Sequence, residues 1–188
     1  MNILRFLFLY AKYLQIKLKY HGRIRFNGFS VVYSFPGSFI NFVGSNICIN
    51  SSPLSNLVGI YQRTIIVARH GGRIQIGENT GISGSTVYSM QRIDIGKNVL
   101  IGGNCKIIDN DFHPLSVEKR VVGQKVEDIK KSPIIIGDGC FIGVNSIILK
   151  GTVLGKNCVV GAGSVVSGHF PDNVIIAGNP AKIVKTNT

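Results

Sequence analysis

The 188-residue sequence contains no tryptophan and only four cysteines, none of them in a CxxC pair. The missing pairs exclude the usual zinc-finger spacings and the thioredoxin-type redox motif. Neither a Walker loop nor a dinucleotide-binding glycine motif occurs, which argues against those phosphate-binding classes. No segment resembles a cleavable signal, so we expect free thiols in a reducing cytosol.

Acidic residues are absent from the first 77 positions, which hold nine Lys or Arg before the first acid, Glu78. The net charge of the chain is +12, and most of it therefore falls in this acid-free part. Such a part attracts anions, whether nucleic acid, anionic lipid or a phosphorylated substrate. The bases are scattered and no RNA-binding aromatic motif accompanies them, so we expect no nucleic-acid partner.

A long apolar run is also lacking, because four Lys or Arg residues interrupt residues 2–20 before a membrane-spanning length is reached. On a helix most of these bases share one sector, which leaves a broad apolar face. That face could pack onto the protein's own core or lie on an anionic membrane, and both uses stay open. Short β-rich runs follow, so residues 1–57 are predicted to form an N-terminal helix and an irregular β cap.

What the sequence does contain is a six-residue repeat. An aliphatic residue recurs without a slip at Ile136, Ile142, Ile148, Leu154, Val160 and Val166, often followed by Gly and preceded two positions earlier by a small residue. Three such hexads make one coil of a solenoid with three flat faces, in which aliphatics fill the interior and small residues fit the corners. Cys140 and Cys158 stand one coil apart among the small residues, so we expect buried and unpaired thiols.

The repeat is interrupted between Ile107 and Ile136 by irregular, charged sequence. This interruption predicts an excursion loop at residues 109–133, and loops on rigid scaffolds commonly carry function. His113 lies at the start of the loop, beside Pro114. It is the strongest candidate for a catalytic side chain.

The hexads resemble those of the hexapeptide-repeat acyltransferases over roughly residues 58–186. The resemblance implies an all-β, left-handed parallel β-helix at residues 58–188, forming one structural domain with the cap. The stretch NVLIGGNCKIIDNDFHPLS and the hexads after the loop are similar to the galactoside, maltose and polysaccharide O-acetyltransferase branch. In that branch the histidine of the His-Pro motif is the general base, which implies this role for His113.

The chemistry suits that role, because a neutral imidazole can accept the proton of a sugar hydroxyl that attacks a thioester. Asp109 or Asp111 would orient the ring or cap the loop, and these alternatives stay open. Ser83 occupies the place of the branch's acceptor-binding Asn. Ser83 and Ser85 can bond to a hydroxyl, or they are simply corner residues of the solenoid.

The resemblance also implies a donor site for acetyl-CoA and no metal. Its residues would contact the pantetheine arm, the nucleotide and the phosphates: Phe141, Gly143, Val144, Gly161, Ala162, Ser167, Lys182 and Lys185. Val144 replaces a small polar residue of the branch, so only its backbone N–H could stabilise an oxyanion. For the two lysines a solvated tail is the alternative.

We therefore expect a cytoplasmic homotrimer with active sites between neighbouring β-helices, as the resemblance implies. Its expected activity is acetyl-CoA-dependent O-acetylation of a saccharide during capsule, lipopolysaccharide or exopolysaccharide synthesis. Residues 2–20 could also contact the inner face of the membrane. The alternatives are an N-acetyltransferase of an amino sugar or nucleotide-linked amino sugar, and a non-catalytic β-helix that serves as a scaffold or binding module.

Overall fold

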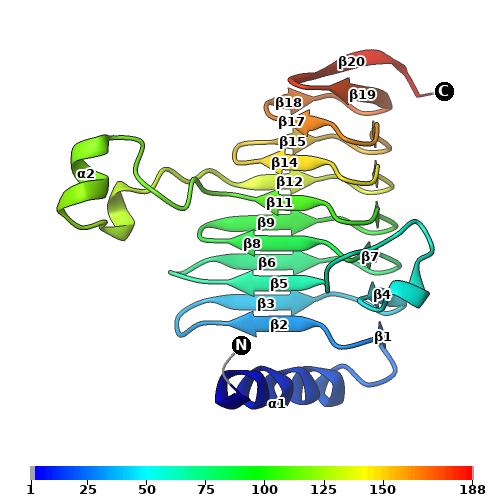
Figure 1. The fold of residues 1–188 in the computed structure, drawn as a ribbon. Helices are drawn as coiled ribbons and strands as arrows, with labels where there is room; N and C mark the ends of the chain where they lie inside the picture. The colour runs from blue at the N-terminus through cyan, green and yellow to red at the C-terminus, as the bar shows by residue number, and fades with distance from the viewer. Residues whose placement is uncertain (1–2, 188) are drawn as a thin grey trace.

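The structure, a computed structural model, describes residues 3–187. One helix, α1 (Ile3–Lys19), lies across the N-terminal end of a stack of short strands (Figure 1). Each turn of the chain adds one strand to each of three sheets, which we name A, B and C. Among the named strands of the described chain, the pairs within the stack are parallel, and the last pair, β19 with β20, is antiparallel.

Sheet A contains β1 (Ile24–Asn27), β4 (Ile47–Asn50), β7 (Gly81–Ser83), β10 (Leu100–Ile101), β13 (Phe141–Ile142), β16 (Val159–Val160), β19 (Val174–Gly178) and β20 (Ala181–Thr186). Sheet B contains β2 (Val31–Ser34), β5 (Ile65–Ala68), β8 (Thr86–Ser89), β11 (Lys106–Ile108), β14 (Ile147–Leu149) and β17 (Val165–Val166). Sheet C contains β3 (Phe39–Phe42), β6 (Arg73–Ile76), β9 (Arg92–Ile95), β12 (Ile134–Ile136), β15 (Val153–Leu154) and β18 (His169–Phe170). The chain visits the sheets in the order A, B, C and so forms a three-sided prism. We name its corners AB, BC and CA after the two sheets that the chain connects at each.

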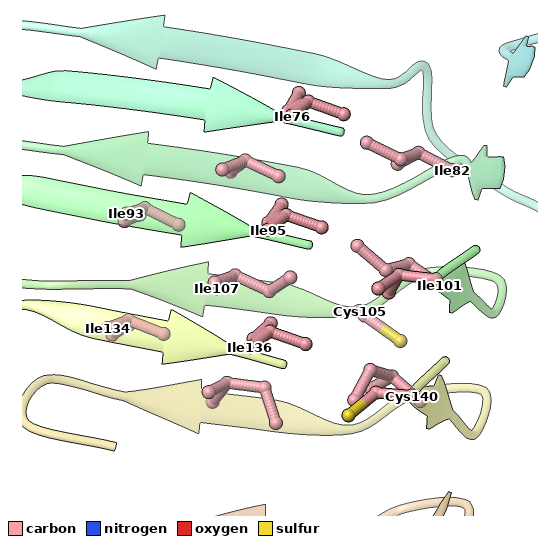
Figure 2. Close-up of a cluster of buried hydrophobic side chains, with 14 of the residues drawn as sticks. Ile76, Ile82, Ile93, Ile95, Ile101, Cys105, Ile107, Ile134, Ile136 and Cys140 are labelled. Atoms are coloured by element: carbon pink, nitrogen blue, oxygen red, sulfur yellow. The ribbon is translucent and has the colours of Figure 1, made fainter. Parts of the chain in front are cut away.

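Aliphatic side chains fill the interior of this prism. Figure 2 shows Ile82 and Ile101 from sheet A, Ile107 from sheet B and Ile136 from sheet C, stacked coil upon coil. All four are at most 2% exposed. A fully buried isoleucine stabilises a fold by about 1.5–3 kcal/mol, so the uninterrupted column explains why the six-residue period dominates the sequence.

Asparagine, rather than glycine alone, makes the tight CA corner. A left-handed backbone with φ between 54° and 57° recurs there at Asn46, Asn79, Asn98, Asn157 and Asn173. Asn tolerates this conformation because its short amide can bond locally. The amides of successive coils also bond to each other, as Asn79 Nδ2 does to Asn98 Oδ1 at 3.0 Å.

The coil stack begins earlier than the predicted boundary at residue 58. Strands β1 and β4 pair in parallel, with Ile24 opposite Ile47, and β4 continues in register into β7. Residues 24–50 are therefore regular coils and not an irregular cap. The period is hidden because residues 51–64 are inserted, so that the bonded pair Asn50 and Ser83 lie 33 positions apart.

Two loops leave the prism on different sides (Figure 1). The His loop, residues 109–133, projects from the BC corner between β11 and β12 and carries α2 (Val117–Val122) and a 3₁₀ turn at Val126–Asp128. Its position matches the predicted excursion. The 51–64 loop, which the sequence analysis did not predict, lies at the AB corner and carries a 3₁₀ turn at Pro53–Ser55.

Helix α1 packs on the stack with only one of its faces. Tyr13 is buried there, with its ring 5.3 Å from the ring of Phe29. The opposite face is exposed, including Leu7 at 56% and Leu18 at 74%. Packing on the protein's own core is thus confirmed for one face. No helix within residues 3–187 is long and apolar enough to cross a membrane.

All four cysteines are free, and Cys105, Cys140 and Cys158 are buried. Each buried thiol lies near a backbone carbonyl of the next coil, as Cys140 Sγ does at 3.1 Å from the oxygen of Gly155. Burial raises the pKa of Cys140 to about 12. These thiols are therefore neutral packing groups, as the sequence predicted.

Candidate active site

The His loop begins with a turn that side chains hold in place. Asp109 is fully buried, and its carboxylate accepts hydrogen bonds from the Ser89 hydroxyl at 2.6 Å and from the backbone N–H groups of residues 90–92 at 2.8–2.9 Å. Asn110 Oδ1 accepts from the N–H of Phe112 at 2.9 Å, and Phe112 has a left-handed φ of 59°. The chain is thereby forced to reverse immediately before His113.

The imidazole of His113 is exposed and has one hydrogen-bond partner in the described chain. Its Nδ1 is 2.7 Å from Oε1 of Gln124, on the returning half of the His loop. An amide oxygen only accepts hydrogen bonds, so Nδ1 donates its proton and Nε2 keeps a free lone pair. Nε2 is therefore the nitrogen that can accept a proton from a substrate.

Helix α2 fixes the backbone that follows His113. The Nη1 atom of Arg120 donates to the carbonyl oxygens of Pro114 at 3.0 Å and Leu115 at 2.8 Å. Lys119 forms an ion pair with Asp128, which ties the helix to the later part of the loop. A helix this short is not stable alone, so these contacts are what order it.

Asp111 does not orient the ring. Its Oδ1 forms an ion pair with Lys150 Nζ at 2.5 Å, and its Oδ2 is buried without a hydrogen-bond partner. No hydrogen bond joins the carboxylate of Asp109 or Asp111 to the His113 ring within residues 3–187. The geometry favours the loop-capping alternative for both, and Gln124 takes the orienting position that sequence reasoning had offered to them.

The predicted donor residues fall in two places. Most of them lie on sheet A or at the AB corner, namely Phe141, Gly143, Val144, Gly161, Ala162, Lys182 and Lys185. Ser167 instead follows β17 at the BC corner, on the same side of the prism as the His loop. The structure therefore groups seven of the eight candidates and separates one.

The outer face of sheet A carries an apolar column that ends in a lysine. Successive strands place Leu100, Phe141, Val159, Ile175 and Lys185 in register. Leu100 is 56% exposed and Phe141 47%. An apolar strip that leads to a basic end fits the chemistry of an elongated ligand with a thin arm and terminal phosphates, as acetyl-CoA has.

The two predicted acceptor serines differ in position. Ser83 stands on the outer face of β7, where its Oγ accepts from Asn50 Nδ2 at 3.0 Å. Ser85 is fully buried at the AB corner, and its Oγ lies 2.8 Å from the Gly102 oxygen and 2.8 Å from the Cys105 nitrogen. Ser85 fits the structural alternative, whereas Ser83 lies at the edge of the candidate site.

The 51–64 loop covers the AB corner beside these residues. Its buried Ile60 packs so closely on Gly84 that a Cβ there would lie 2.8 Å from the Ile60 Cβ. Asn104 holds the loop backbone, because its Oδ1 accepts from the Tyr61 N–H at 3.1 Å. Val58 and Val144 both approach Gly103, so the loop reaches the corner where the oxyanion donor is predicted.

A single chain does not bring the candidate base and the candidate substrate residues together. His113 projects from the BC corner, whereas Ser83, Val144 and Ala162 lie at sheet A and the AB corner (Figure 1). Within residues 3–187 no three His, Cys, Asp or Glu side chains are grouped closely enough to hold a metal ion. The described chain thus places the two groups of candidate residues at different corners of the prism.

Sequence reasoning missed two parts of this arrangement. Gln124 is an isolated amide in a charged loop, and no spacing marks it. The 51–64 loop could have been inferred from the break in hexad spacing between Ile49 and Ile82, together with the turn-forming SSP sequence at 51–53.

Comparisons with known proteins agree with the repeat. A family model described as "Hexapeptide repeat of succinyl-transferase" matches residues 92–122 and 133–167. The chain is 33% identical over 151 residues to the "Probable acetyltransferase Rv3034c" of Mycobacterium tuberculosis, a match that covers 77% of this chain and 49% of the relative. The chain spans about half the length of the first curated relatives that it matches.

Solved structures show the same architecture. A maltose O-acetyltransferase from Clostridium difficile 630 aligns with a TM-score of 0.57 and 29% identity over 81% of this chain and 70% of that one. The polySia-specific acetyltransferase NeuO aligns with a TM-score of 0.63 and 26% identity over 87% and 65%. These matches confirm the predicted left-handed parallel β-helix and the resemblance to hexapeptide-repeat sugar acetyltransferases.

Proposed function

On the premise of this confirmed likeness to hexapeptide-repeat acyltransferases, we propose that the chain is an acetyl-CoA-dependent O-acetyltransferase of a saccharide hydroxyl. The proposal rests on the position of His113 at the start of the His loop and on the contact between its Nδ1 and Gln124, which leaves Nε2 able to accept a proton. The matched maltose and polySia acetyltransferases support a saccharide acceptor. We place the reaction in surface polysaccharide synthesis, as for capsule, lipopolysaccharide or exopolysaccharide.

In this mechanism Nε2 of His113 accepts the proton of the acceptor hydroxyl as its oxygen attacks the thioester carbonyl. The carbon–sulfur bond then breaks, and the imidazolium returns the proton to the departing thiolate. The backbone N–H of Val144 is the proposed donor to the oxyanion. The column that ends in Lys185, together with Lys182, would hold the arm and phosphates of acetyl-CoA.

The separation of the two half-sites supports a homotrimer. His113 of one copy would face sheet A and the AB corner of a neighbouring copy, so that each active site forms between two chains. Cyclic symmetry generates such repeated heterologous interfaces and closes the ring. The four free thiols suit a reducing compartment, and we place the trimer in the cytoplasm.

The test of the proposed chemistry is His113→Ala, with CoA release measured against a panel of neutral and acidic sugars. We expect kcat to fall by about 100-fold or more, the lower range for general-base catalysis, while CoA binding is retained. His169→Ala is the matched control, because His169 is an exposed histidine on sheet C that is not among the proposed site residues. Full activity of His113→Ala would refute the mechanism.

The same assays decide between this proposal and its alternatives. NMR of the product distinguishes an ester, formed by O-acetylation, from an amide formed on an amino sugar. Calorimetric titration with CoA addresses the non-catalytic scaffold, which requires no CoA binding. A micromolar dissociation constant would remove the scaffold alternative.

We also propose that the outer face of α1 lies on an anionic membrane. Ile3, Leu7, Leu14 and Leu18 are exposed on this face at 39–74%, on the side away from the stack. Lys and Arg side chains flank them, and no acid occurs before Glu78. An apolar helix face bordered by bases has the chemistry of an interfacial helix on anionic lipid.

Co-sedimentation with phosphatidylglycerol vesicles tests this contact. The double substitution Leu7→Gln and Leu18→Gln is expected to weaken binding by about 10-fold or more, since each buried leucine contributes about 1.5–3 kcal/mol. Val121→Gln, an exposed apolar residue of α2, serves as the control. Unchanged vesicle binding, or a loss of self-association instead, would contradict the membrane contact.

A further inference from the structure

A basic groove lies at the N-terminal end of sheet A, between the end of α1 and strands β1 and β4. Its volume is about 520 Å³, and its lining includes Lys17, His21, Arg23 and Arg25. Among residues 3–187, no acidic side chain lines it. The groove therefore concentrates positive charge in a concave site, where an anion is attracted more strongly than on a flat surface.

The cations of this groove are available to a ligand. Arg23 is held in place by the protein, because its Nε donates to the Gly44 oxygen at 2.8 Å and its Nη2 to the Phe42 oxygen at 3.1 Å. Within residues 3–187 neither Lys17 nor Arg25 is paired with a carboxylate. The positive charge is thus positioned but not neutralised.

A row of amides leads from the groove toward the candidate reaction centre. Asn27 Nδ2 donates to Asn50 Oδ1 at 2.7 Å, and Asn50 Nδ2 donates to Ser83 Oγ at 3.0 Å. These residues occupy one column on the outer face of β1, β4 and β7, which spans about 10 Å at roughly 4.8 Å per strand. Asparagine is disfavoured in strands, whereas its paired donor and acceptor suit the hydroxyl groups of a sugar.

The outer face of sheet A becomes apolar on the strands that follow β7. The next strands present the exposed apolar side chains of Leu100 and Phe141, which belong to the proposed donor column. The polar row and the apolar column therefore run side by side at β7, where Leu100 stands in register with Gly81, two positions before Ser83. A ligand lying on the polar row would bring one end to the place where the donor column begins.

We propose that the groove and the Asn27–Asn50–Ser83 row form the acceptor-binding subsite, and that the acceptor is an anionic saccharide. Its negative group would lie among Lys17, Arg23 and Arg25, while its hydroxyls bond to the amide row. The negative group is either the carboxylate of an acidic sugar or a phosphate linked to the sugar. This inference rests on the proposed function, because it assigns the substrate class of that site.

The subsite is tested by calorimetric titration of the full chain without acetyl-CoA, so that the result is independent of catalysis. The probes are a sialic acid hexamer for carboxylates, glucose 1-phosphate and inorganic pyrophosphate for phosphates, and maltohexaose as the neutral oligosaccharide. The variants are Lys17→Gln combined with Arg25→Gln, and Asn50→Ala. Arg73→Gln is the matched control, since Arg73 is an exposed strand residue on sheet C.

We expect the sialic acid hexamer or a phosphate probe to bind, and the Lys17→Gln/Arg25→Gln variant to weaken that binding by about 10-fold at 50 mM salt. Binding of the hexamer would identify a carboxylate as the negative group, and binding of a phosphate probe would identify a phosphate. Asn50→Ala should weaken binding of the sialic acid hexamer more than binding of pyrophosphate, because only the sugar has hydroxyl groups that can bond to the Asn27–Asn50–Ser83 row. Arg73→Gln should change affinity less than about twofold.

Three results would overturn the proposal. The first is that no anionic probe binds more tightly than about 1 mM, a binding free energy of about 4.1 kcal/mol. The second is equal affinity of the charge variant and the parent for every probe. The third is that the charge variant loses binding only to phosphatidylglycerol vesicles, which would assign the groove to lipid. CoA binding that persists in any of these cases leaves the proposed transferase intact.

Discussion

The carboxamide of Gln124 decides which nitrogen of the His113 ring is available for chemistry. Its oxygen lies 2.7 Å from Nδ1, so the proton is held there and Nε2 keeps its lone pair. In the proposed mechanism Gln124 acts through His113 and is a positioning residue. Neither carboxylate at the start of the loop takes this role, because Asp109 closes the turn at residues 89–92 and Asp111 is paired with Lys150.

Substitution of Gln124 is expected to change the pH profile of transfer. In Gln124→Glu a carboxylate replaces the amide and favours the imidazolium, so the acidic limb of kcat/KM against pH moves to higher pH. Gln124→Ala should lower kcat by about 10-fold without that displacement, because it only releases the ring. Identical pH profiles for parent and Gln124→Glu would show that the amide does not control the ring.

The buried thiol of Cys140 makes the stability of the fold depend on alkaline pH. Burial raises the pKa of Cys140 to about 12, whereas an unfolded thiol has a pKa of about 8.5. The folded state thus keeps the proton that the unfolded state loses, and this stability is present below about pH 8.5 and lost as the pH rises toward 12. The loss amounts to about 1.4 kcal/mol for each pH unit in that window.

Cys140→Ser removes this titration and keeps a small hydroxyl that can donate to Gly155. Urea unfolding measured from pH 8 to pH 10.5 should therefore give a smaller alkaline loss of stability for the variant than for the parent. Equal losses would mean that other groups dominate the alkaline behaviour.

At the scale of elements, the 51–64 loop is held by close packing rather than by pairing with a strand. Its buried Ile60 fits over Gly84, which has a positive φ of 50°. Any side chain at Gly84 would both strain the backbone and push against Ile60. The loop can therefore be released from the AB corner by a single methyl group.

Gly84→Ala is expected to free the 51–64 loop, seen as faster limited proteolysis within residues 54–58. Gly71→Ala is the matched control, because Gly71 has a φ of 82° but nothing within 4 Å of the added methyl. Both variants share the backbone strain, of about 1–2 kcal/mol, and only Gly84→Ala has the clash. Equal cleavage of this segment in both would show that Ile60 does not anchor the loop.

At the scale of the whole molecule, the two halves of the site lie at different corners of one prism. His113 is on the side of α2, and Ala162 with the donor column is on sheet A and the AB corner (Figure 1). A prism filled with stacked isoleucines cannot bend to bring these corners together. Under the proposed function, a second copy supplies the missing half.

Subunit mixing tests this view. His113→Ala and Ala162→Trp, a variant designed to block the proposed donor site at the AB corner, should each be inactive alone. In trimers assembled from equal amounts of both, about a quarter of the sites would pair an intact His113 with an intact donor half. Recovered activity near that fraction is expected on co-refolding, and no recovery would place the complete site within one chain.

The interior of this protein can be predicted from its amino-acid sequence alone. The six-residue period from Ile136 to Val166 arises because each coil packs on the next coil. Such a period predicts the fold without knowledge of contacts between distant parts of the chain. The break in that period also located residues 109–133, with His113 at their start. These features depend only on neighbouring positions in the chain.

Contacts between residues that are distant in the chain depend instead on the folded structure. Residues 24–50 join the stack although an insertion hides their period, and Ser85 turns inward while Ser83 meets Asn50 across 33 positions. Gln124 reaches His113 because two ends of a loop return to one corner. Hydrogen bonds and steric fit depend on which residues are close in space, not on their spacing in the chain. The repeat therefore predicts the β-helix, whereas the contacts of the candidate site residues are seen only in the folded structure.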